Sequence, residues 1–134
     1  ALSAAVGQAV TYEIGASHPD WPAEDALSAG SGVCQDHTHV FIACARAMGL
    51  PARYVSGYLM LNDRIDQEAM HAWAEAHIEG LGWVGFDPSN GISPDSRYVR
   101  VATGLDYTEA APIHGLRIGP GAEALDVQIA VAQQ

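Results

Sequence analysis

Residues 71 to 78 alternate strictly between large or polar side chains and smaller apolar ones, and this stretch limits the possible folds more than any other. In an extended chain the alternation puts the large or polar members on one face and the apolar members on the other: His71, Trp73, Glu75 and His77 against Ala72, Ala74, Ala76 and Ile78. Gly80 and Gly82 then predict a turn, and residues 83–87 predict a return strand. The stretch therefore predicts an antiparallel hairpin.

A helix is expected before this hairpin. Residues 34–48 place apolar side chains at three- and four-residue spacing, and Gly49-Leu50-Pro51 is a strong stop signal. Residues 53–61 then predict a strand, and residues 62–68 a polar loop. Residues 1–15 have helical spacing, residues 17–32 look like a turn-rich loop, and short β-like pieces are expected at 98–101 and 125–131. A helix followed by antiparallel strands favours an α+β domain.

Length and charge narrow the functional classes. The chain has 134 residues, 49% of them apolar and 16% charged, which fits one globular domain. The net charge of −10 argues against nucleic acid and anionic membrane as partners. No apolar run approaches the roughly 20 residues that span a bilayer.

The two cysteines, Cys34 and Cys44, are expected to be free thiols. On one helix they would lie about 15 Å apart, whereas a disulfide needs Cα atoms within about 7 Å. Free thiols favour the cytoplasm, although composition alone leaves the compartment open. Residues 1–16 contain no basic residue and so do not form a secretory signal, and the start at Ala1 fits either a removed Met or a piece of a longer chain.

Cys34 follows Gly30-Ser31-Gly32-Val33 and falls at the predicted helix start. Unpaired backbone N–H groups there favour a thiolate and could stabilise a developing oxyanion. The alternative is an ordinary small buried cysteine. Cys44 lies in mid-helix on the apolar stripe and is predicted to be core.

His71 and Asp87 are expected at the same open end of the hairpin, because one begins the first strand and the other ends the second. An imidazole held by a carboxylate suits general acid–base chemistry. A half-exposed strand histidine and a strand-end cap are the alternatives for each residue taken alone. With Cys34 they would form a nucleophile, a base and an orienting acid.

Four segments together resemble the transglutaminase-like superfamily, and more narrowly its bacterial cysteine-protease-like branch. The resemblance covers roughly residues 30–120 and rests on these motifs: Gly32-Val33-Cys34-Gln35-Asp36-His37, Gly49-Leu50-Pro51-Ala52-Arg53-Tyr54-Val55-Ser56-Gly57-Tyr58, His71-Ala72-Trp73-Ala74-Glu75 and Gly82-Trp83-Val84-Gly85-Phe86-Asp87-Pro88-Ser89-Asn90. It implies a papain-like core in which a helix carrying the nucleophile packs on an antiparallel sheet. It also implies Cys34 as nucleophile, His71 as general acid/base and Asp87 as orienting carboxylate.

The same resemblance implies an amide-bond enzyme that works through a thioester on a peptide or protein carboxamide. Hydrolysis is favoured over crosslinking because of the branch that the chain resembles. No phosphate-binding glycine loop follows a strand, so no cofactor is expected. Relatives carry a β-rich domain before the catalytic one, so residues 1–134 are expected to be a single catalytic domain from a longer protein.

Further residues are candidates for lining or supporting the site. Tyr12 is preferred over Gln8 and Trp21 as a side-chain oxyanion donor. Asp36 is expected either to cap the helix or to take part in the chemistry. Trp73 is predicted to be a wall of the site or part of the core. Two other aromatic residues are expected to be structural rather than to line the site: Tyr58 and Tyr107.

Two rival functions remain at this point. The first is a binding or scaffold module that has kept the fold without turnover. The second is a zinc hydrolase, because Cys34 and His37 are one helical turn apart and could face one metal.

Overall fold

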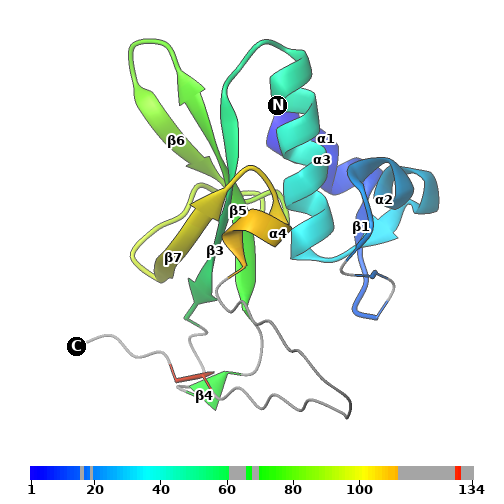
Figure 1. Cartoon of the computed structure of the whole chain (residues 1–134). Helices are drawn as coiled ribbons and strands as arrows, with labels where there is room; N and C mark the ends of the chain where they lie inside the picture. Colours follow the sequence, from blue (N-terminus) through cyan, green and yellow to red (C-terminus); the bar gives the residue numbers. More distant parts are fainter. Residues whose placement is uncertain (16, 19, 61–65, 68–69, 112–128, 131–134) are drawn as a thin grey trace, which may run out of the picture.

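The structure is a computed structural model that describes residues 1–15, 17–18, 20–60, 66–67, 70–111 and 129–130. Helices lie on one side of a four-stranded sheet (Figure 1), which confirms the α+β class. The elements run in this order: α1 (Leu2–Ala9), β1 (Thr11–Tyr12), α2 (Ala23–Ala29), β2 (Ser31–Gly32), α3 (Cys34–Ala47), β3 (Ala52–Leu59), β4 (Asp66–Gln67), β5 (His71–Ile78), β6 (Gly82–Phe86), β7 (Tyr98–Gly104), α4 (Tyr107–Ala110) and β8 (Ile129–Ala130).

The main sheet has the strand order β6-β5-β3-β7, and all neighbours are antiparallel. The predicted hairpin is confirmed as β5 and β6, with Ala74 opposite Phe86. Its turn uses Gly80 and Gly82, both at φ 84°, in the left-handed region that glycine adopts without strain. The hairpin's open end therefore lies at the start of β5.

The predicted helix α3 begins at Cys34 and ends at Ala47. Its end has the expected cap: the Leu50 N–H donates to the Ala45 carbonyl and the Gly49 N–H to the Arg46 carbonyl, both at 3.0 Å. These two bonds satisfy carbonyls that the helix leaves open.

The core forms where α3 packs on β5 and β3. The β5 face toward the core carries only small side chains in its buried part, so the helix can approach the sheet closely: Ala72, Ala74 and Ala76. Phe41 of α3 stacks on Phe86 of β6 with ring centroids 5.0 Å apart. Cys44 packs against this core as predicted, and both cysteines are free.

The prediction of a loop over residues 17–32 was wrong, because this stretch contains α2 and β2. Pro22 is the N-cap of α2, Glu24 and Asp25 fall in its first turn, and Gly30 closes it at φ 71°. The flanking turn residues are therefore the two ends of a short helix.

The strand expected at 98–101 extends to Gly104 as β7, and α4 after it was not predicted. Within the polar loop expected at 62–68, Asp66–Gln67 is β4, which pairs with β8 from the β-like piece expected at 125–131. The rest of both stretches lies outside the described residues. In the described part of the chain no helix is long and apolar enough to cross a membrane.

Candidate active site

Cys34 is the first residue of α3, directly after the short strand β2. Its backbone N–H is one of the N-terminal donors that a helix cannot satisfy internally. Asp36, 1% exposed, accepts a hydrogen bond from the Val33 N–H at 2.9 Å and so braces the turn before the thiol. A Cβ on Gly32 would lie 2.7 Å from the Asp36 Cβ, so this close approach requires glycine. Asp36 therefore has the capping contact that its position predicts.

His71 and Asp87 meet as expected at the open end of the hairpin. The His71 Nε2 lies 2.7 Å from the Asp87 Oδ2. The histidine side chain is 11% exposed and the aspartate side chain 0%. Because water is excluded, the electrostatic attraction between the two groups is stronger than it would be at the surface.

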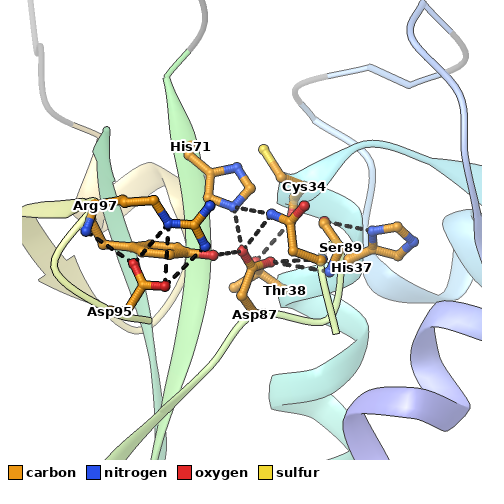
Figure 2. A network of polar contacts seen from close by, with 10 residues as sticks. Cys34, His37, Thr38, His71, Asp87, Ser89, Asp95 and Arg97 are labelled. Carbon is orange, nitrogen blue, oxygen red and sulfur yellow. Dashed lines mark hydrogen bonds and ion pairs between the residues drawn. The ribbon is translucent and has the colours of Figure 1, made fainter. Parts of the chain in front are cut away.

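The His71 ring also faces Cys34 (Figure 2), so it lies between a thiol and a carboxylate. Its Nε2 is occupied by Asp87, which leaves Nδ1 for the thiol. Burial lowers the pKa of His71, but the hydrogen bonds to Asp87 and Cys34 and their negative charges outweigh burial and raise it to about 9. The geometry therefore favours an imidazolium at neutral pH.

Asp87 is held by donors from several segments. Its Oδ2 accepts from His71, from the Asn90 side chain at 2.8 Å and from the Tyr98 hydroxyl at 2.5 Å. Its Oδ1 accepts from the Ser89 N–H at 3.1 Å. Burial raises the pKa of Asp87, but these donors and the charge of His71 outweigh burial and lower it.

A cavity of about 190 Å³ opens at the thiol and the imidazole. Apart from Cys34 and His71 it is lined by apolar or neutral polar side chains: Val33, Gln35, Tyr54, Ser56, Met70, Ala72 and Tyr107. Tyr107 was expected to be structural and instead lines the cavity. Ser56, buried at 4% exposed, was not singled out from the sequence, because only its pairing opposite Ala72 brings it beside His71.

Tyr12 lies on β1 opposite Gly32, two residues before Cys34. Burial raises the pKa of Tyr12, and the nearby charges of Cys34 and Asp87 raise it further, so the phenol stays protonated and can donate. Of the other two candidates, Gln8 is exposed on α1, and Trp21 lines a separate cavity of about 390 Å³.

Trp73 is 2% exposed and is absent from the lining of the Cys34 cavity. Its ring packs against His71 with centroids 6.2 Å apart and edge-on against Tyr98 at 5.1 Å. Trp73 is therefore buried, but it lies outside the core under α3, on the other face of β5, where it packs beside the imidazole.

His37 does not face a metal with Cys34, which removes the basis of the zinc alternative. Its Nε2 lies 2.6 Å from the Val10 carbonyl and its Nδ1 lies 2.7 Å from the Ser89 Oγ. Both ring nitrogens are thus used within the protein, and the ring is 2% exposed. Within the described residues, no three His, Cys, Asp or Glu side chains are grouped to hold a metal ion.

A helix-borne thiol beside an imidazole and a carboxylate on an antiparallel sheet defines a class of cysteine-dependent enzymes. The comparisons give the family. The chain belongs to the transglutaminase-like superfamily, whose core model matches residues 1–88.

The chain is also similar to several individual proteins. An uncharacterised protein of Mycobacterium leprae is 39% identical over 81% of this chain and 40% of its own length. An uncharacterised protein of Mycobacterium tuberculosis is 40% identical over 79% of this chain and 37% of its own. A "Putative Cysteine Protease from Cytophaga hutchinsonii" has the same fold at TM-score 0.71 and 34% identity, over 82% of this chain and 36% of that one.

A "Protein-glutamine gamma-glutamyltransferase" of Pseudomonas aeruginosa is 31% identical over 65% of this chain and 15% of its own length. Family and neighbours together support a cysteine-dependent enzyme class. The chain spans about two fifths of the length of the mycobacterial relatives.

Proposed function

We propose that this chain is a cysteine-dependent amide-bond enzyme in which Cys34 is the nucleophile, His71 the general acid/base and Asp87 the orienting carboxylate. The observation that carries the proposal is the buried contact of 2.7 Å between His71 and Asp87, with the other face of the imidazole turned to the thiol at a helix start. Structural cysteines rarely have such an arrangement, whereas a thiol nucleophile needs it.

The first half of the reaction would form a thioester. The Cys34 thiolate attacks the carbonyl carbon of a carboxamide, and the tetrahedral oxyanion collapses as the C–N bond breaks. The proton on His71 Nδ1 passes to the leaving nitrogen, which departs as a neutral amine or ammonia. Asp87 keeps the ring oriented because its Oδ2 holds Nε2.

The second half would release the acyl group. Neutral His71 takes a proton from water or from a primary amine, whose oxygen or nitrogen attacks the thioester carbon. The C–S bond then breaks and the thiolate returns beside the imidazolium. We favour hydrolysis as the outcome of this step. The name of the Pseudomonas relative makes acyl transfer to an amine the second outcome to test.

Two donors suit the oxyanion. One is the Cys34 backbone N–H at the start of α3, and the other is the Tyr12 hydroxyl on the neighbouring strand β1. Loss of one such donor typically costs about 10²–10³ in rate, so Tyr12→Phe should slow acylation by a factor of this order.

The cavity at Cys34 supports an uncharged acyl group of modest size. It has about 190 Å³ and is lined by neutral side chains apart from the reacting pair, although the whole chain carries a net charge of −10. We therefore propose a peptide or protein carboxamide as substrate, with the acidic surface acting only outside this cavity.

The direct test is the pH dependence of cysteine alkylation. Iodoacetamide would be applied between pH 4 and 10, and mass spectrometry would read the two cysteines separately. Cys34 is expected to react well below the pH at which an ordinary thiol does, and Cys44 serves as the internal reference. His71→Ala should remove the low-pH reactivity, whereas His77→Ala on the exposed end of the same strand should not.

Acyl transfer is then read with p-nitrophenyl acetate. An acetyl group should appear on Cys34 in the intact mass and should disappear faster in the presence of a primary amine if transfer occurs. If Cys34 reacts no earlier than Cys44, or if His71→Ala leaves its profile unchanged, the proposed function is wrong for this chain. A binding or scaffold module without turnover would then be the better hypothesis.

A further inference from the structure

Three donors converge on a single oxygen of Asp87. The Oδ2 accepts from His71 Nε2 at 2.7 Å, from Asn90 Nδ2 at 2.8 Å and from the Tyr98 hydroxyl at 2.5 Å. The carboxylate is 0% exposed, so water does not compete for these hydrogen bonds. Orientation of His71 alone would need only one of the three, and the other two require a different explanation.

A neutral donor on a carboxylate lowers the basicity of that carboxylate. Each hydrogen bond from Tyr98 or Asn90 draws charge away from the oxygen that His71 also uses, so the imidazolium is stabilised less than it would be by a carboxylate with fewer donors. Tyr98 can fill this role at every working pH. Burial first, and then the contact with Asp87, raise the pKa of its phenol well above the usual range.

We infer that Tyr98 and Asn90 are positioning residues that set the acidity of His71 by sharing the Asp87 Oδ2 with it. The inference rests on the proposed function, in which His71 must give up its proton to a leaving nitrogen. A carboxylate that held the imidazolium more tightly would make that proton harder to transfer. Tyr98 would therefore keep His71 acidic enough to act as a general acid.

The surroundings of His71 contain the charged groups needed to interpret a titration. Cys34 faces it from α3 and Asp87 from the end of β6. Tyr12 on β1 is influenced by the charges of both. Beyond Tyr98, Arg97 is paired with Asp95 at 2.9 Å on the surface and influences the phenol rather than the imidazole.

The test measures the pKa of His71 itself, by long-range proton–nitrogen NMR of the imidazole between pH 5 and 11. Tyr98→Phe keeps the ring that packs on Trp73 at 5.1 Å and removes only the hydroxyl. The pKa of His71 should rise by about half a pH unit or more, since a hydrogen bond to a charged group is among the stronger ones. Asn90→Ala should act in the same direction, and the double variant should rise furthest.

The sign of the shift separates this role from simple support. If Tyr98 only held Asp87 in place, its loss would loosen the contact with His71 and lower the pKa. Tyr58→Phe removes a phenol on β3 that neither lines the cavity nor donates to Asp87, so the pKa of His71 should stay unchanged. Near-ultraviolet circular dichroism would verify that each variant is folded.

The inference and the proposed function can fail separately. A His71 in the unaltered chain that titrates near 6.5 and does not influence Cys34 alkylation would overturn the proposed function. A raised pKa in the unaltered chain, followed by a lower or unchanged value in Tyr98→Phe, would overturn the inference alone.

Discussion

Raising the pH above neutrality should separate the two tasks of His71. Its imidazolium lies between the Asp87 carboxylate at 2.7 Å and the Cys34 thiol, and its pKa is raised to about 9. Above that pH the ring loses the proton that a leaving amine needs, while the thiolate remains available. Amide cleavage should therefore fall on the alkaline side, whereas reactions that need only the thiolate should not.

The size of the effect follows from the same contacts. The rise in pKa from 6.5 to about 9 corresponds to about 3 kcal/mol of preference for the charged ring. Once the pH exceeds this value, the charged fraction falls about tenfold for each further unit. Asp87→Asn removes the carboxylate charge, so the alkaline fall in amide cleavage should begin at a lower pH. At pH values below that fall, the rate of amide cleavage should be lower than in the unaltered chain by roughly 10³-fold or more.

The assay compares two substrates that share one acyl group, p-nitroacetanilide and p-nitrophenyl acetate. The anilide needs a proton on its leaving nitrogen, whereas p-nitrophenolate leaves without one. Acylation by the anilide should fall above about pH 9, while acylation by the ester and alkylation by iodoacetamide should stay level. The ester thus controls for alkaline unfolding within the same protein sample.

Two results would refute this reasoning. One is that the rates with the anilide, the ester and iodoacetamide all fall together at alkaline pH, which would mean that the protein unfolds there. The other is that the alkaline fall in anilide cleavage occurs at the same pH in Asp87→Asn, which would mean that the carboxylate does not govern the charge of His71. Stability gives an independent reading, because a raised histidine pKa adds stability below pH 6.5 that is lost as the pH rises through about 9.

Three further predictions concern stability. Gly57→Ala places a Cβ in steric clash with the Val99 backbone carbonyl, so the free energy of unfolding measured in urea should fall by about 2 kcal/mol or more. An unchanged unfolding midpoint would contradict this close approach of the two strands. Ala74→Leu puts a large side chain under α3 and should cost about 1–3 kcal/mol by thermal melting, whereas a neutral effect would mean that space remains between helix and sheet. The lowered pKa of Asp87 adds stability above its usual value of 3.8, and this stability is lost as the pH falls through the lower pKa of the folded state. Asp87→Asn should therefore make the free energy of unfolding, measured in urea at a series of acidic pH values, depend less on pH. An equal pH dependence in both proteins would contradict this prediction.

The hairpin and the central helix could be predicted because their signals are local. Period-two alternation and a Gly-Leu-Pro stop each depend on a few neighbouring residues, and both were confirmed in β5, β6 and α3. The antiparallel pairing predicted that His71 and Asp87 lie at the same open end, but the register, which places Ala74 opposite Phe86, could not be read from the sequence. Proximity of two residues 16 apart in sequence was thus predictable because a single turn joins their strands, whereas their direct contact was not.

The support around Asp87 could not be predicted in the same way. Tyr98 reaches it only because β7 pairs with β3 rather than with β6, and a strand order is not readable from alternation. The helix α2 was missed for another reason, since its seven residues are shorter than two helical repeats and lie between turn-forming residues. For Tyr98, the deciding interaction lies outside the sequence window that carries the strand signal.

His37 links the two halves of the site through buried polar contacts. It lies one turn after Cys34 on the same helix, and its ring joins the Val10 carbonyl to the hydroxyl of Ser89. The Ser89 N–H in turn donates to Asp87, so the segment that carries the carboxylate is tied to the helix that carries the thiol. Apolar packing of the small alanines under α3 brings the helix close to the sheet but has little directional preference of its own. The hydrogen bonds of His37 and Ser89 are directional, so they add to the core packing a fixed contact between the helix that carries the thiol and the segment that carries the carboxylate.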